Sequence, residues 1–371
     1  MTAPLTAPAP LLPRPTTTPP VPASAAQTLA RCRSLVLPAL TAAVDRLHPY
    51  PGEMAAFSFG WCEVGGTPAA GRPGGGKSGG KGVRQALAVL GAEAAGAPGA
   101  TAVAGAVAVE LIHAFSLLHD DIMDGDETRR RRASVWKAYG TGPAVLAGDA
   151  LFALAVQTLA ESHGPHGGAA IRQLSGALGD LVRGQAEDLL FESRPWTGPD
   201  AVRTAEYRAM AEGKTGALLG CAAALGAQLA GAPEPVVTAL DRAGRHVGVA
   251  FQAVDDLLGI WGDPRVTGKP VHGDLRRRKK TLPLLAALAA DGPAARELAS
   301  LLGAALDTSP DDAAVHRAAE LVEEAGGRAA TLAEAHHHLD AARAQLASVP
   351  LAPTAAAELL ALLPFLVDRA L

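Results

Sequence analysis

The sequence is poor in cysteine and in aromatic residues, and each shortage excludes a class of protein. Among 371 residues there are three cysteines, Cys32, Cys62 and Cys221, and aromatic side chains make up 4%. Widely spaced cysteines in odd number, without a Cys-x-x-Cys pair, argue against a disulfide framework or a zinc site and favour a reducing, cytoplasmic setting. A net charge of −4 offers no general attraction to nucleic acid or to an anionic membrane, so neither is an expected partner.

Long hydrophobic runs are missing as well. The longest uncharged stretch, 215–233, consists mainly of alanine and glycine with Gln228 inside it, which is typical of a packed core helix. The sequence therefore predicts no transmembrane segment. Residues 1–27 are rich in proline and alanine and resemble neither a signal peptide nor a transit peptide, so we expect a disordered tail.

Alanine- and leucine-rich blocks, punctuated by glycine and proline, fill the rest of the chain. This pattern predicts an all-α fold in one domain over residues 28–371, and 49% hydrophobic residues suffice for a large core. A Gly-rich loop at 64–80 interrupts the pattern. The predicted helices cover 27–47, 82–96, 100–125, 143–162, 168–192, 199–230, 234–262, 281–304, 311–325, 327–347 and 353–370.

The stretch "LLHDDIMDGDETRRRR" at 117–132 sets five acidic residues against four arginines. Asp120 and Asp124 share one helical face, where their charges repel unless a cation lies between them. Magnesium prefers carboxylate, water and phosphate oxygens, and guanidinium groups such as those of Arg129 and Arg130 can grip diphosphate. We expect both arginines one and a half to two helical turns beyond the acids. An exposed ladder of ion pairs is the alternative interpretation.

Further segments carry groups suited to phosphate. Gln252, Asp255 and Asp256 end an apolar helix, so a second acidic helix end could face the first. Basic residues lie in three other segments, "GGKGVR", "EGKTGAL" and "VTGKP", which contain Lys81 and Arg84, Lys214 with Thr215, and Lys269. Lys81 and Arg84 stand at a predicted helix start, where backbone N–H groups favour anions.

These segments occur in the order found in a known family. "GGKGVR", "DDIMD" with "RR", "GDALFALA", "GQAEDL", "KTG", and "FQAVDD" with "GDPRVTGKP" and "DLRRRKKTLP" resemble the motifs of the short-chain trans-isoprenyl diphosphate synthases. The resemblance implies long helices around a central cavity, a homodimer, and three Mg2+ ions between two Asp-rich motifs. It also implies condensation of isopentenyl diphosphate with an allylic diphosphate (dimethylallyl, geranyl or farnesyl) to geranylgeranyl or farnesyl diphosphate, with release of diphosphate.

The same resemblance implies a role for each motif residue. The implied metal ligands are Asp120, Asp124 and Asp255, which we expect to carry catalysis together with Lys214, Lys269 and Arg129. The residues implied for the allylic substrate are Arg129, Lys214, Gln252 and Lys269, with Thr215 as a further substrate contact. Those implied for isopentenyl diphosphate are Lys81, Arg84, His113 and Arg130. Phe115 and Ser116, before the first motif, are implied to point down the cavity and set chain length, with Phe115 as its floor.

Some residues have a plainer interpretation. His113 lies on an apolar helix and could be a core histidine, and Phe251 could be core packing. Gln185 and Asp188 could form a buried polar pair, and Lys279 with Lys280 a solvated charge run. We rank Phe251, the polar pair and the charge run below the motif residues.

Two alternative functions stay open. A class I terpene cyclase also uses an Asp-rich motif and magnesium, but its second metal motif usually begins with asparagine, and this sequence contains none. A catalytically weak regulatory subunit is the other alternative, because Gly259 stands where the second motif commonly ends in a third aspartate. We expect an active enzyme. The N-terminal tail is a candidate docking segment for a bacterial shell or another partner.

Overall fold

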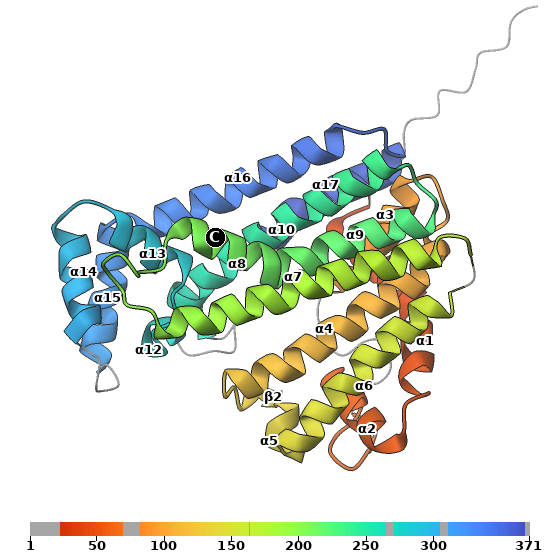
Figure 1. Cartoon of the computed structure of the whole chain (residues 1–371), viewed down its shortest axis with the longest axis horizontal. Helices are drawn as coiled ribbons and strands as arrows, with labels where there is room; N and C mark the ends of the chain where they lie inside the picture. The colour runs from red at the N-terminus through yellow and green to blue at the C-terminus, as the bar shows by residue number, and fades with distance from the viewer. Residues whose placement is uncertain (1–22, 70–81, 163, 265–270, 305–310, 368–371) are drawn as a thin grey trace, which may run out of the picture.

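Long helices account for nearly all of the described structure. The computed structural model describes residues 23–69, 82–162, 164–264, 271–304 and 311–367 (Figure 1). The first helices are α1 (Ala25–Val44), α2 (Pro49–Ser58), α3 (Val83–Ala94), α4 (Val103–Met123), α5 (Val135–Tyr139), α6 (Thr141–Ala160) and α7 (Gly167–Ser193). They are followed by α8 (Thr204–Ala211), α9 (Ala217–Leu229), α10 (Glu234–Trp261), α12 (Gly273–Arg276), α13 (Leu282–Ala289), α14 (Pro293–Ala304), α15 (Asp312–Glu324), α16 (Gly327–Ala347) and α17 (Pro353–Val367). The all-α prediction is confirmed.

Helix α9 lies at the centre of the bundle. Every residue from Ala217 to Ala227 is buried, and α9 packs against α3, α4, α7 and α10, while α16 covers α10 (Figure 1). An uncharged sequence of alanine, glycine and leucine is what such a position requires, since each face of the helix meets another helix. The uncharged stretch at 215–233 is thus the core helix that the sequence predicts.

Glycine lets the central helices approach each other closely. A Cβ atom on Gly226 of α9 would lie 1.9 Å from the carbonyl oxygen of Ala88 on α3. A Cβ atom on Gly91 of α3 would lie 2.1 Å from the carbonyl oxygen of Ala223. The two backbones are therefore in direct contact, and small residues rather than aromatic rings fill the space between them.

A smaller hydrophobic cluster lies at the end of α10. Ile260 of α10 packs there with Leu284, Leu298 and Leu321 of α13, α14 and α15 (Figure 1). This cluster supports the segment that follows the second acidic motif.

Several predicted helices are broken differently. The predicted helix 199–230 is α8, a π-helical turn (Glu212–Gly216) and α9, and the predicted helix 281–304 is interrupted at Asp291 and Gly292 between α13 and α14. A 3-10 turn (Gly99–Ala102) precedes α4. Helices α2 and α5 were not expected, because both are short and α2 contains two prolines.

The arginine run is a hairpin, so its predicted helical placement is wrong. Helix α4 ends at Met123, and Gly125 adopts a left-handed conformation with φ 66° that terminates it. The strands β1 (Thr128–Arg129) and β2 (Arg132–Ala133) pair antiparallel, and Arg130 and Arg131 form the turn with φ 53° and 63°. Two positive φ angles match the twist of a two-residue hairpin, which places the arginines beside α4 rather than beyond it.

The N-terminal helix begins within the predicted tail. Ser24 and Gln27 form a capping box, in which the Ser24 Oγ accepts from the Gln27 N–H and the Gln27 Oε1 accepts from the Ser24 N–H. Residues 1–22, and with them the candidate docking segment, lie outside the described residues.

Two helices meet the length and composition of a membrane span. They are α4 with its preceding turn, Gly99–Met123, and α6. Length and composition alone are weak evidence, and the two helices pack against each other, with α4 also against α9. The burial of α4 in the bundle explains its hydropathy. Helix α6 keeps an exposed apolar face.

Gly226→Ala should lower the free energy of unfolding by about 2 kcal/mol, because the methyl group must push two backbones apart. Urea denaturation would measure it. Gly303→Ala on α14 is the matched control, since a Cβ there meets nothing within 4 Å and the substitution should stabilise the helix slightly. Equal stability of the two variants would contradict the close packing of α3 and α9.

Candidate active site

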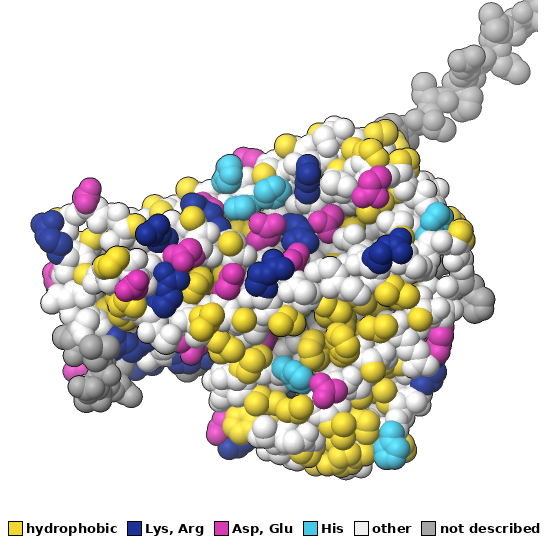
Figure 2. All heavy atoms as spheres, in the orientation of Figure 1, with side chains coloured by type: hydrophobic (Ala, Val, Ile, Leu, Met, Phe, Trp, Pro, Cys, Tyr) yellow, Lys and Arg dark blue, Asp and Glu magenta, His cyan; other side chains and the backbone are white. Residues whose placement is uncertain are grey.

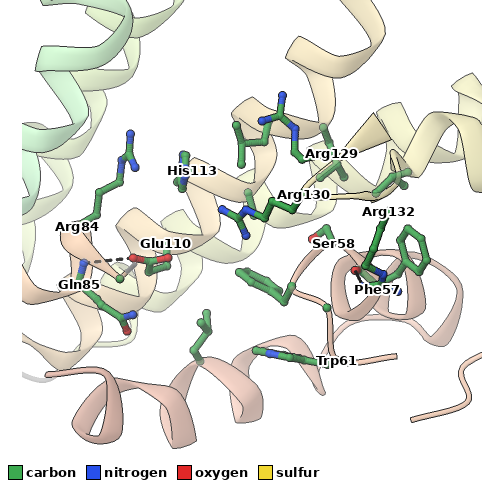
Figure 3. Close-up of a pocket in the computed structure, with 18 of the residues that line it drawn as sticks. Phe57, Ser58, Trp61, Arg84, Gln85, Glu110, His113, Arg129, Arg130 and Arg132 are labelled. Atoms are coloured by element: carbon green, nitrogen blue, oxygen red, sulfur yellow. Dashed lines mark hydrogen bonds between the residues drawn. The ribbon is translucent and has the colours of Figure 1, made fainter. Parts of the chain in front are cut away.

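A cavity of about 500 Å3 lies between α1, α3, α4 and the β1–β2 hairpin (Figure 3). The cationic residues that line it are Arg33, Arg84, Arg129, Arg130 and Arg132, against the two carboxylates of Glu110 and Asp121. An excess of guanidinium groups in a cavity of this size suits a small polyanion such as a diphosphate.

Arg84 and Glu110 lie together in the wall of this cavity. Arg84 stands in the first turn of α3, which Gly82 begins with a φ of 68°. The Gln85 N–H donates to the Glu110 Oε1 at 3.2 Å. Burial raises the pKa of Glu110, with the charge of Arg84 acting in the opposite direction. Glu110 therefore offsets part of the positive charge gathered around Arg84, and sequence reasoning had not singled it out.

His113 lines the cavity beside Arg84 and Arg130 (Figure 3). Burial and the charges of these two arginines hold the pKa of His113 well below its usual value. The imidazole is consequently neutral at pH 7 and can donate through one nitrogen and accept through the other. Its place at the cavity wall favours the binding role over the core-histidine alternative.

Three arginines of the hairpin line the cavity, and two of them, Arg129 and Arg132, also hold the hairpin in place. The Arg129 Nε donates to the Asp121 Oδ1 at 2.7 Å, and Asp121 is only 2% exposed. Arg132 donates to the backbone carbonyls of Phe57 and Cys62 at 3.1 Å and 2.7 Å. These bonds hold the hairpin against α4 and α2, and Arg130 extends from it into the cavity (Figure 3).

The first acidic motif lies on the neighbouring face of α4. Burial raises the pKa of Asp120 to about 6, with Lys214 lowering it and Asp124 raising it. The Lys279 Nζ donates to the Asp124 Oδ2 at 3.1 Å. Lys279, which we had ranked as part of a solvated charge run, is thus an ion-pair partner of the motif across 155 residues of sequence.

Lys214 comes from the π-helical turn between α8 and α9. Gly184 of α7 permits this turn to approach, since a Cβ there would lie 2.2 Å from the Lys214 nitrogen. The Lys214 Nζ donates to the Asp188 Oδ2 at 2.5 Å. Burial opposes its charge, but Asp188, Asp120 and Asp124 together raise the pKa of Lys214. Asp188 therefore pairs with Lys214 and not with Gln185, as the plainer interpretation had it, and among the described residues the Gln185 Nε2 has no hydrogen-bond partner.

The second acidic motif has one buried and one exposed acid. Asp256 is 3% exposed and accepts hydrogen bonds from the Tyr207 hydroxyl, the Leu282 N–H at 2.8 Å and the Gln252 Nε2 at 3.0 Å. Burial raises its pKa to about 7. The Thr215 Oγ1 in turn donates to the Gln252 Oε1 at 2.9 Å. Asp256 is an internal anchor, whereas Asp255 is exposed to solvent.

The donor set fits magnesium when a diphosphate is bound as well. Among the described residues, no three His, Cys, Asp or Glu side chains gather closely enough to hold a metal by themselves. Magnesium usually binds through one or two carboxylates, with water and substrate phosphates completing its shell. Asp120, Asp124 and Asp255 supply hard oxygen donors of this kind.

The remaining candidate residues lie elsewhere. Lys81 and Lys269 are outside the described residues. Phe115 does not line the 500 Å3 cavity, because His113, Leu117 and Asp121 occupy that face of α4 at intervals of four residues. Phe115 instead packs against Phe152 of α6, with 5.6 Å between the ring centroids.

Ser116 does not line this cavity either. Its Oγ donates to the carbonyl of His113 at 3.0 Å. Ser116 lies four residues before Asp120 and therefore on the same helical face as the first motif.

Comparison with known proteins decides the family. The model of the polyprenyl synthetase family matches residues 76–322. The chain belongs to this family. A (2E,6E)-farnesyl diphosphate synthase of Mycobacterium tuberculosis is 46% identical over 345 residues, which cover 92% of each chain. A geranylgeranyl diphosphate synthase of the same organism is 46% identical over 300 residues, 81% of this chain and 82% of the relative.

Solved structures agree with this assignment. The crystal structure of a polyprenyl synthetase from Streptomyces coelicolor A3(2) superposes with a TM-score of 0.84 at 48% identity, covering 92% of this chain and 99% of that one. A polyprenyl synthase from Caulobacter crescentus CB15, complexed with calcium and isoprenyl diphosphate, superposes with a TM-score of 0.78 at 29% identity, covering 95% and 100%. This polyprenyl synthetase is a magnesium-dependent prenyltransferase that makes short-chain prenyl diphosphates from isopentenyl diphosphate, as the sequence motifs indicate.

Replacement of His113 tests its neutral state. His113→Gln should keep the KM for isopentenyl diphosphate within about tenfold, because an amide can also donate and accept. His113→Leu should raise this KM by roughly 10- to 100-fold, since a hydrogen bond to a charged group contributes about 1.5–3 kcal/mol. Steady-state kinetics at pH 6 to 8 would measure both. A wild-type KM that rises steeply as His113 loses a proton in this range would contradict the assignment.

Proposed function

We propose that the chain is an active synthase that holds its two diphosphate substrates on adjacent faces of α4. One observation carries the proposal: α4 presents His113 to an arginine-lined cavity and Asp120 with Asp124 to Lys214. An excess of arginines over carboxylates suits a diphosphate that stays bonded to its substrate, and carboxylates with cations suit one that leaves with magnesium.

The arginine-lined cavity is the proposed site of isopentenyl diphosphate. The residues assigned to it are Lys81, Arg84, His113 and Arg130. Burial and neighbouring positive charges lower the pKa of Arg84 and of Arg130. A bound dianionic group relieves the repulsion between these charges. Glu110 limits this repulsion in the absence of substrate.

The acidic face of α4 is the proposed site of the allylic diphosphate. The residues assigned to it are Asp120, Asp124 and Asp255 as metal ligands, and Arg129, Lys214, Thr215, Gln252 and Lys269 as substrate contacts, with three Mg2+ ions per site. When bound, magnesium neutralises the charge that builds on the departing diphosphate. The hydrogen bond to Asp188 positions Lys214, which adds a further positive charge beside the departing diphosphate. The isopentenyl double bond then attacks the allylic cation, and the proton lost afterwards is taken by the departing diphosphate.

Condensation by the purified protein tests the proposal. In the presence of magnesium, the protein should condense isopentenyl diphosphate with dimethylallyl, geranyl or farnesyl diphosphate and release a linear prenyl diphosphate and inorganic diphosphate. A cyclic hydrocarbon would favour the terpene cyclase alternative. Inactivity with every primer, reversed by mixing with a second prenyl synthase, would favour the regulatory subunit.

Asp120→Ala should reduce turnover by about a thousandfold or more, because it removes a carboxylate from the site where charge develops. Chelation of magnesium should do the same in the wild type. The matched control is Asp312→Ala, which removes an exposed carboxylate that pairs with Arg276. Circular dichroism should show unchanged helix content in both variants. Full activity without a divalent cation would refute the metal assignment.

Phe115→Ala should lengthen the product. Phe115 and Phe152 together close the space between α4 and α6, so removal of one ring opens room for further isoprene units. Product length is read by chromatography of the dephosphorylated alcohols, with geranylgeranyl expected slightly ahead of farnesyl for the wild type. An unchanged product distribution would show that Phe115 is not the floor.

A second copy of the chain is the proposed partner. Exposed apolar side chains follow α6 and α7, among them Leu146 (51% exposed), Val182 (59%) and Leu190 (64%), and Figure 2 shows apolar surface over this part of the molecule. Sedimentation equilibrium should therefore give the mass of two chains, and Leu146→Glu with Leu190→Glu should shift it toward one. A monomeric wild type would contradict the homodimer.

A further inference from the structure

Arg33 of α1 is an arginine of the cavity to which no role has been assigned so far. It lines the cavity with Leu37 and Leu40, which follow one and two helical turns later, so one face of α1 forms part of the cavity wall. The residue is half-buried, and within the described part of the chain no hydrogen bond or ion pair holds its guanidinium group. The charge of Arg33 is therefore available to a ligand in the cavity.

The neighbouring Arg31 fixes the orientation of α1. Its Nη1 and Nη2 groups donate to the carboxylate of Glu93 on α3 at 2.6 Å and 2.8 Å, and Nη2 also donates to Glu358 on α17 at 2.6 Å. Arg33 follows two residues later, which is about 200° further around the helix axis. The contacts that hold Arg31 against α3 and α17 thus turn Arg33 to the opposite side, toward the cavity.

Two charged groups of the cavity are close enough to Arg33 to respond to its charge. Burial raises the pKa of Glu110, and the charge of Arg33 is among those that lower it. Burial lowers the pKa of Arg130, and the charge of Arg33 lowers it further. Arg33 therefore adds positive charge where guanidinium groups already repel one another, and a bound anion relieves this repulsion.

The position of Glu110 indicates which end of the substrate Arg33 meets. Glu110 lies ten residues before Asp120 in α4, which corresponds to about 15 Å along the helix axis. The isopentenyl double bond must reach the allylic carbon at the acidic face, beside Asp120. The diphosphate of the same molecule therefore points away from Asp120, and its outer phosphate lies at the end of the cavity that Arg33 and Glu110 share.

We propose that Arg33 binds the outer phosphate of isopentenyl diphosphate, so that α1 contributes a residue to the substrate site. The inference rests on the proposed location of isopentenyl diphosphate in the arginine-lined cavity. A planar guanidinium group can donate two parallel hydrogen bonds to one phosphate. Because the outer phosphate carries the greater share of the negative charge, Arg33 also selects a diphosphate over a monophosphate.

Steady-state kinetics with each substrate varied in turn tests the proposal. Arg33→Gln should raise the KM for isopentenyl diphosphate by about tenfold, because hydrogen bonds to a charged group are lost. The KM for the allylic substrate should stay within about twofold and kcat within about threefold, since Arg33 lies far from the acidic motifs. Arg33→Lys keeps the charge without the planar fork and should raise the KM for isopentenyl diphosphate by only about threefold.

Arg46→Gln is the matched control. It makes the same change of charge just beyond the end of α1, at an exposed arginine that pairs with Glu161 and does not line the cavity. Both KM values should stay within about twofold of wild type, because exposed ion pairs contribute little. Circular dichroism should give Arg46→Gln and Arg33→Gln the same melting temperature as the wild type.

Isopentenyl monophosphate, which lacks the outer phosphate, locates the contact. As a competitive inhibitor against isopentenyl diphosphate, it should have the same inhibition constant, within about twofold, in the wild type and in Arg33→Gln. The substitution in the protein and the truncation of the ligand then remove one and the same interaction. An equal weakening of diphosphate and monophosphate would place Arg33 away from the outer phosphate and overturn the inference.

The outcomes separate this inference from the proposed function. If the wild type condenses its substrates and Arg33→Gln has the same KM values as Arg46→Gln, Arg33 does not contact the substrate, and the inference is overturned while the assignment as a synthase stands. A rise of both KM values in Arg33→Gln indicates a general disturbance of α1 and overturns it as well. A wild type that forms no prenyl diphosphate refutes the proposed function, and the inference with it.

Discussion

The buried carboxylate of Asp256 joins the elements on which the active site is built. It accepts hydrogen bonds from Tyr207 of α8, from Gln252 of α10 and from the backbone at the start of α13. A carboxylate at this depth is stable only with such partners, because an unpaired charge would cost several kcal/mol of desolvation. Gln252 in turn accepts a hydrogen bond from Thr215, which follows Lys214 in the chain. The placement of Lys214 and Asp255 therefore depends on the buried carboxylate of Asp256.

Charge balance explains the rest of the site. Three acids of the first motif region have a cation beside them: Arg129 lies at Asp121, Lys279 at Asp124 and Arg277 at Asp126. Like charges on adjacent turns of α4 would otherwise destabilise the helix. On the other face of α4 the arginines outnumber the acids, and Glu110 is the carboxylate beside them. The two faces of one helix thus differ in the sign of the charge that predominates on them, and the proposal of two diphosphate sites rests on this difference.

Close helix packing carries this arrangement. Gly91 and Gly226 bring α3 into contact with α9, and Gly184 brings α7 to the turn that holds Lys214. Side chains larger than hydrogen at these positions would widen the bundle and move Arg84 or Lys214 away from α4. The close approach of these helices therefore explains why the sequence contains few aromatic residues.

The sequence by itself determined what depends on local spacing. The helical periodicity, the shared face of Asp120 and Asp124, and the order of the motifs follow from residues close together in the chain, and the all-α fold and the family were predictable from them. Positions that depend on distant partners were not. Gly125 and two left-handed arginines turn the basic run back along α4, and Asp188 meets Lys214 only because Gly184 admits the π-helical turn. Lys279 reaches Asp124 across 155 residues of sequence, and no local pattern marks this contact. Contacts between side chains far apart in sequence depend on how the helices pack, and only the tertiary structure decides them.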